Sequence, residues 1–297
     1  MKKIALTSML AVFAASSAMA AHVSNPLYIP AKGEFYSVTD VMSATNRNID
    51  VIAPYQNADM GTTGATATET FGYGLTNWLS ASVNASASTQ NWFELNTFND
   101  LGLGLNARVL NHEGWVADIF GGYEVNNVRG YNQVAFDKDN TWYTWTAGVR
   151  GGYTTGAWTV AARAAFGYTN SESFNWDESF DGDARLSGHY LQFGLDGQLY
   201  LTQNWNLVAG AEYNIRYDAN TEESWSNNGG YWKGTLGINY DFNPCSYVGA
   251  YVSKIMVHDG QKEVELEDGQ TEMVPASAGN WDVADGFIFG AKFGVKF

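Results

Sequence analysis

The chain ends with residues 287–297, which read FIFGAKFGVKF. Bulky apolar side chains stand at nearly every second position, and glycines and lysines stand between them. Because successive side chains of a β-strand point to opposite faces, this stretch predicts a strand with one apolar and one polar face. Such a strand suits a membrane-spanning β-barrel, whose outer surface contacts lipid while its inner surface contacts water. The stretch therefore predicts the closing strand of a transmembrane barrel.

The opposite end of the chain has the features of a secretory leader. Two lysines and a short apolar run open the chain, and small residues ending in Ala20 follow. This order is typical of a cleaved signal peptide. The run is too short to cross the hydrocarbon core of a bilayer, which is about 30 Å thick. We therefore expect a signal peptide at 1–20, a periplasmic N-terminal tail at 21–32 and one transmembrane barrel domain at 33–297.

Aromatic residues recur just after short polar turns, at Trp78, Trp115, Trp158 and Trp205, with Tyr247 in the corresponding place of a fifth turn. Successive members are 37, 43, 47 and 42 residues apart. Each interval accommodates two strands of about ten residues and one long loop. Since amphipathic aromatic side chains favour the membrane–water interface, we expect these residues to form an aromatic girdle at the periplasmic rim.

Alternation between these turns predicts an all-β fold, a single antiparallel up-and-down transmembrane β-barrel. Twelve strands fit best, and ten or fourteen are the alternatives because the first and eleventh strands alternate weakly. An even number brings both termini to the periplasmic side. The predicted strands are 33–46, 65–75, 79–88, 100–110, 115–126, 141–153, 157–168, 188–201, 206–217, 231–242, 246–257 and 286–297.

The leader, the short turns alternating with long polar loops, the aromatic girdle and the terminal phenylalanine together resemble the bacterial outer-membrane β-barrel, or porin-like, class. The resemblance covers essentially all of the mature chain. It implies a place in the outer membrane of a Gram-negative bacterium, in contact with its lipid and lipopolysaccharide. It also implies that the barrel-insertion machinery recognises Phe293, Val295 and Phe297, although Lys292 stands where the usual signal has glycine.

Acidic residues are concentrated in the predicted long loops. The six loops contain 21 acidic and 5 basic residues, whereas the rest of the mature chain is nearly neutral. Such a mouth would concentrate cations within about 8 Å, the Debye length at physiological salt. Alternatively, the acids keep the surface soluble and bind divalent ions that bridge to lipopolysaccharide. The residues assigned to this acidic mouth are Glu172, Asp177, Glu178, Asp181, Asp183, Glu263, Glu265, Glu267 and Asp268.

The predicted inward faces carry six basic and four acidic residues. We expect Arg108 and Asp118 to lie close across their hairpin, and Arg163, Asp196 and Glu212 to lie at a similar height on neighbouring strands. These side chains either line a watery constriction or pair across the lumen and plug it. Inward glycines, Gly290 and Gly294 among them, favour a narrow open pore. The expected pore-lining residues are Arg108, Asp118, Glu124, Arg150, Arg163, Asp196, Glu212, Arg216, Lys233 and Lys292.

The sequence indicates no catalytic residue, no cofactor and no metal site. His22 lies in the predicted tail, His112 in a turn, and His189 and His258 at strand–loop borders, so a hydrolytic constellation with serine has little support. Cys245, the sole cysteine, has no internal partner for a disulfide. An acidic mouth would also repel nucleic acid.

These features predict a non-enzymatic channel for passive diffusion of small hydrophilic solutes, with a mild preference for cations set by the acidic loops. A monomer is slightly favoured, since most trimeric porins are longer. The alternative is a closed structural or surface-recognition barrel, similar to an adhesin, whose loops contact a partner. An outer-membrane hydrolase that uses His189 or His258 ranks third.

Overall fold

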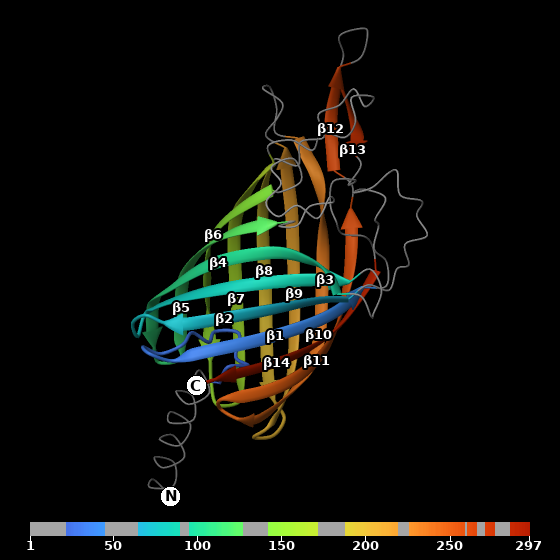
Figure 1. Ribbon diagram of the computed structural model, residues 1–297. Helices are drawn as coiled ribbons and strands as arrows, with labels where there is room; N and C mark the ends of the chain where they lie inside the picture. The colour runs from blue at the N-terminus through green and yellow to red at the C-terminus, as the bar shows by residue number, and fades with distance from the viewer. Residues whose placement is uncertain are drawn as a thin grey trace, which may run out of the picture.

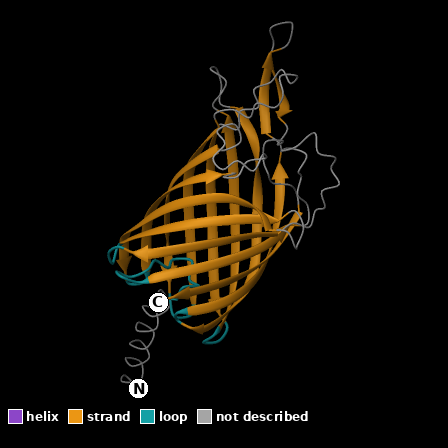
Figure 2. Cartoon of the chain, viewed as in Figure 1, coloured by secondary structure: helices purple, strands orange, loops and turns teal. Residues whose placement is uncertain are grey.

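The structure is a computed structural model, and it describes residues 22–44, 65–89, 95–126, 142–171, 188–218, 226–258, 260–265, 271–276 and 286–297. No helix in these ranges is long and apolar enough to span a membrane. Their regular structure consists of strands (Figures 1 and 2). The strands are β1 Phe35–Ala44, β2 Ala65–Gly74, β3 Leu79–Thr89, β4 Leu95–His112, β5 Trp115–Asn126, β6 Trp142–Thr154, β7 Trp158–Ser171, β8 Gly188–Tyr200, β9 Trp205–Asp218, β10 Ser226–Asn243, β11 Ser246–His258, β12 Gly260–Glu265, β13 Thr271–Ala276 and β14 Gly286–Lys296.

Twelve of these strands close into an antiparallel barrel. Each strand from β1 to β10 pairs with its successor, ending with the β10–β11 pair, and β14 lies between β11 and β1. At the seam, Phe35 and Phe297 exchange backbone hydrogen bonds of 2.8 and 2.9 Å. The predicted twelve-stranded up-and-down barrel is therefore confirmed, and the C-terminal stretch is its closing strand.

The barrel has an apolar outside and a polar inside. Large side chains such as Leu103, Leu105 and Trp145 are more than half exposed on the outer surface, whereas polar side chains such as Asn206 and Thr159 are buried inside. Alternation places these two classes on opposite faces of each strand. This arrangement is the one that a surrounding bilayer requires.

The short connections share one end of the barrel, called here the short-turn end; the opposite rim is the long-loop end (Figure 2). Trp78, Trp115, Trp158 and Trp205 are exposed at the short-turn end, as the girdle prediction requires. The prediction for Tyr247 is wrong, because this residue is only 6% exposed. Odd-numbered residues of β11 point inward, so Tyr247 faces the lumen while its neighbour Val248 faces outward.

The predicted loop 258–285 contains regular structure. β12 and β13 pair with each other, and Gln261 of β12 also pairs with Asn227 of β10. This hairpin extends beyond the long-loop end (Figure 1). The loop assignment was wrong because the sequence lacks a clear apolar alternation here: β12 has charged residues at both odd and even positions, and β13 is short and contains Pro275.

Candidate functional site: the barrel lumen

Residues 22–34, called here the N-terminal segment, lie inside the short-turn end of the barrel. Leu27 is fully buried and packs in one cluster with Val116 of β5 and Ala161 of β7, whose side chains point inward. The described part of the stretch expected as a periplasmic tail therefore lies against the lumen wall. It narrows this end of the lumen.

Asn25 shapes the segment locally and also fastens it to the wall. Its side-chain oxygen accepts a 2.8 Å hydrogen bond from the backbone N–H of Leu27, which forms an Asx-turn. Its backbone carbonyl accepts a 2.9 Å bond from the N–H of Tyr28. The side-chain amide donates to the Thr159 hydroxyl of β7 at 2.9 Å. The same residue thus turns the chain and anchors it.

Two arginines of the same wall, Arg108 on β4 and Arg150 on β6, hold the backbone of the segment. The Asp118 carboxylate has no exposed surface and accepts hydrogen bonds from Arg108 Nε at 2.8 Å and from Arg150 Nε at 3.0 Å. The predicted proximity of Arg108 and Asp118 is therefore confirmed. A guanidinium group has five N–H donors, so both arginines retain donors after pairing with Asp118. Arg108 donates to the carbonyl of Leu27, and Arg150 donates to the carbonyl of Pro26 at 2.8 Å.

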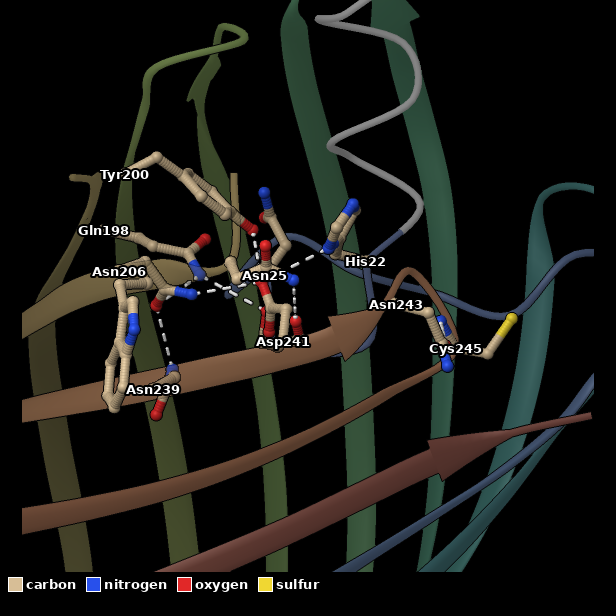
Figure 3. A network of polar contacts seen from close by, with 12 residues as sticks. His22, Asn25, Gln198, Tyr200, Asn206, Asn239, Asp241, Asn243 and Cys245 are labelled. Carbon is tan, nitrogen blue, oxygen red and sulfur yellow. Dashed lines mark hydrogen bonds and ion pairs between the residues drawn. The ribbon is translucent and has the colours of Figure 1, made fainter. Parts of the chain in front are cut away.

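A second anchor forms around Asp241 of β10 (Figure 3). Its buried carboxylate lies 3.3 Å from His22 Nδ1 and accepts hydrogen bonds from the Tyr200 hydroxyl at 3.0 Å and from the Asn206 amide at 3.1 Å. Asn206 also accepts an amide hydrogen bond from Gln198 at 3.0 Å. Strands β8, β9 and β10 therefore present one connected polar network to the first residue of the segment.

Sequence reasoning missed Asp241. It stands next to a short turn at an odd position of β10, where Asn239 and Asp241 are buried while Leu236 and Phe242 are exposed. Carrying the alternation of β10 to its end would have placed this carboxylate in the lumen.

The segment joins β1 through a turn that contains Gly33 and packs against Gly74 at the end of β2. Gly33 has a φ of 83°, a conformation that side chains with a Cβ rarely adopt. Its N–H donates to the carbonyl of Gly74 at 2.8 Å. A Cβ on Gly74 would collide with the backbone carbonyl of Ala31. Where the chain enters the lumen, the backbone of the N-terminal segment therefore packs directly against the backbone of β2.

An ion pair closes this entry. Glu34 lies 2.9 Å from Lys296 Nζ and accepts a 2.8 Å hydrogen bond from the N–H of Ala31. Burial raises the pKa of the Glu34 carboxyl, but these two hydrogen bonds outweigh burial and hold the pKa below its ordinary value. Burial, together with the Glu34 carboxylate, raises the pKa of Tyr28. The ring of Tyr28 packs edge to face against Tyr36.

Further toward the long-loop end, charges pair along the wall. Arg163 of β7 contacts Asp196 of β8 at 3.1 Å and also contacts Glu212 of β9. Lys233 of β10 contacts the same Glu212 carboxylate at 3.3 Å. The predicted grouping of Arg163, Asp196 and Glu212 is therefore confirmed. These ion pairs join adjacent or next-adjacent strands, so they follow the curve of the wall and do not cross the lumen.

The remaining predicted pore-lining residues are placed separately. Lys292 lies 3.4 Å from Asp40, an inward acid that was not among the predicted pore-lining residues, and Asp40 also accepts a 2.9 Å hydrogen bond from Tyr251. Glu124 is on the inward face of β5. Arg216 belongs to β9, but its side chain is not among those that the structure describes.

The inward glycines do not leave the free space that the sequence suggested. A Cβ added at Gly290 would collide with the ring of Tyr251, and one added at Gly294 would collide with the ring of Tyr247. These glycines allow tyrosine rings from the next strand to lie flat against the wall. The expectation that Gly290 and Gly294 leave room for a pore is therefore wrong.

Most of the predicted acidic mouth lies outside the described residues: Glu172, Asp177, Glu178, Asp181, Asp183, Glu267 and Asp268. Glu263 and Glu265 belong to β12. Within the described ranges, no group of three or more histidine, cysteine or acidic side chains is arranged to hold a metal ion. Of the expected insertion signal, Phe293 and Phe297 are exposed on the outer surface.

Several solved structures share this architecture. The NanC porin matches with a TM-score of 0.50 and 9% identity over 89% of this chain and 100% of its own. The COG4313 outer membrane channel from Pseudomonas putida F1 matches with a TM-score of 0.50 and 11% identity over 91% of this chain and 97% of its own. This chain has the fold of a bacterial outer-membrane β-barrel. No protein-family model matches the sequence, and no curated protein sequence matches it either.

Proposed function

We propose that the protein is a channel of the bacterial outer membrane through which small hydrophilic solutes diffuse passively. One observation carries this proposal: the ion pairs of Arg163, Glu212 and Lys233 run along the wall and not across the lumen. Charges paired in this way line a watery passage without filling it. The fold shared with the NanC porin and the COG4313 channel is in keeping with this reading.

The N-terminal segment would set the narrowest part of this passage. It is held by Arg108 and Arg150 on one side and by the Asp241 network on the other. Solutes would pass beside it at the short-turn end, so we expect a small conductance and a low size limit.

The long loops would set a mild preference for cations. They carry 21 acidic and 5 basic residues and follow the strands at the long-loop end. In the orientation implied by the class resemblance, this rim faces the exterior and the N-terminal segment faces the periplasm. Lipopolysaccharide would surround the loops, and Phe293, Val295 and Phe297 would serve the insertion machinery.

Single-channel recording tests the proposal directly. The full mature protein, purified from outer membranes, is placed in a planar bilayer with a salt gradient across it. We expect steady conductance and a reversal potential that favours cations. Anion selectivity would show that the lumen arginines dominate the loops. Silence from a correctly folded barrel would contradict the channel.

A closed structural or surface-recognition barrel is the second candidate, and the buried N-terminal segment favours it. In this case the wild type is silent. Deletion of loop residues would then abolish binding of a partner without any effect on permeability. A variant that releases the segment would conduct where the wild type does not.

A further inference from the structure

The outer surface of the barrel carries a carboxylate where lipid is expected. Glu69 of β2 is on the same face as Phe71, which is 57% exposed to the surroundings of the barrel. Its two carboxylate oxygens accept hydrogen bonds of 2.5 Å from the hydroxyls of Ser37 and Thr39 on β1. Glu69 stands mid-strand, with residues of β2 on both sides of it.

A carboxylate facing hydrocarbon is costly, and ionisable residues at such positions usually serve a contact or a function. Two hydroxyl donors lower this cost, but among the described residues no cation is paired with Glu69. The outward positions around it carry small side chains, such as Ala67, Ala81 and Ala85. Small residues allow the backbones of two membrane proteins to approach closely.

A groove of about 620 Å³ opens on another part of the outer surface. Its floor includes the outward-facing small residues Ala209, Ala211 and Gly234, and Lys254 and Phe287 line one side. Lys254 is on the same face of β11 as the exposed Met256. Its ammonium group lies 4.9 Å from the centre of the Phe287 ring, and no carboxylate of the described residues is paired with it. The groove is mostly apolar; besides Lys254, its lining includes Asp196 and Thr235, which belong to the inward faces of β8 and β10.

The two features are at similar heights on the barrel. Glu69 pairs with Thr39, and Thr39 pairs with Phe293. Phe293 pairs with Val248 of β11, and Lys254 is six positions beyond Val248 toward the long-loop end. The strands are tilted and lie one above another in Figure 1, so a path across the paired strands from β11 to β2 also rises toward the long-loop end. At a tilt of roughly 40°, six residues along β11 rise by about 15 Å and three strand intervals rise by about 9 Å, so the two side chains differ by about 6 Å in height.

We propose that copies of this chain associate in the membrane, with the β1–β3 face of one copy packed into the β9–β11 groove of the next. Glu69 of one copy pairs with Lys254 of its neighbour, so that each charge on the outer surface is satisfied by the other. The faces differ, so the contact is head to tail, and it forms a closed ring when the rotation closes. Three of the twelve strand intervals separate Glu69 from Lys254, so a small ring suits this geometry.

Carbodiimide cross-linking in isolated outer membranes tests this contact, because the reagent joins a carboxylate to an amine only when they touch. We expect cross-linked multimers and, by mass spectrometry of the digest, a peptide pair joined through Glu69 and Lys254. Glu69→Gln and Lys254→Gln should each reduce the multimers at least tenfold. Glu113→Gln, at an exposed short turn, is the matched control and should leave them unchanged.

The exchanged pair separates contact from general damage. Glu69→Lys alone should abolish cross-linking, and Glu69→Lys combined with Lys254→Glu should restore it. Native mass spectrometry of the wild type should give a multimer. A monomer, with or without a bound anionic lipid, would overturn the proposal, as would multimers that persist in both glutamine variants.

Discussion

The guanidinium of Arg150 on β6 donates a 2.8 Å hydrogen bond to the carbonyl oxygen of Pro26, a residue 124 positions earlier in the chain. This contact joins the barrel wall to the N-terminal segment. The contact depends on Asp118, whose carboxylate accepts a 3.0 Å hydrogen bond from Nε of the same Arg150 guanidinium. The wall charges and the segment therefore form one structural unit, and changes to either should alter both stability and conductance.

Asp118→Ala should destabilise the barrel and release the segment. It leaves two partly buried arginines without their fully buried counter-ion, and removal of one partner from a buried ion pair typically costs about 3–5 kcal/mol. Equilibrium unfolding in detergent measures the loss. Asp196→Ala is the matched control, because the Asp196 side chain is 34% exposed and a partly exposed pair is worth about 1 kcal/mol or less. Equal losses in the two variants would contradict the role of Asp118.

Leu27→Ala should undock the segment without damage to the barrel. Leu27 is fully buried against Val116 and Ala161, and such a truncation costs about 2–5 kcal/mol. We expect faster proteolysis within residues 22–34 and a larger single-channel conductance. Leu27→Met keeps the volume and should preserve both properties. If conductance is unchanged while proteolysis accelerates, the segment does not limit the passage.

Acidification should loosen the entry of the segment. The pKa of Glu34 is lower in the folded protein than in the unfolded chain, because hydrogen bonds from Lys296 and Ala31 outweigh burial. Its contribution is therefore complete above the ordinary carboxyl pKa of about 4.3 and disappears as pH falls through the lowered value. Proteolysis of the segment by an acid-active protease should rise over this range. Glu34→Gln should remove that step from the pH profile.

Arg163→Trp should reduce conductance, because Arg163 is on the inward face of β7 and its substitution both fills space and removes a charge. We expect a fall of at least twofold in single-channel current. Ala164→Trp places the same ring on the adjacent outward position and should leave the current unchanged. Equal currents in wild type and Arg163→Trp would show that the permeation path does not pass Arg163.

The strands could be predicted from the sequence because one face of each strand contacts lipid and the other faces the polar lumen. Residues such as Leu103 and Leu105 alternate with small or polar ones, and this period of two located all twelve barrel strands. The same reasoning brought Arg108 beside Asp118, since a short turn fixes the pairing of its two strands. It did not locate β12 and β13, because these strands have only six residues each and show no regular alternation of apolar and polar residues.

By itself, the sequence determined which side of most strands faces lipid and that charges such as Arg108 and Asp118 are neighbours, because these follow from local alternation and short turns. Only the tertiary structure decided that the N-terminal segment lies inside the lumen, and that tyrosine rings fill the space over inward glycines. Barrel closure brings Pro26 to Arg150 and His22 to Asp241. Contacts inside the barrel join residues that are far apart in the chain, so they cannot be predicted from the local alternation of residues.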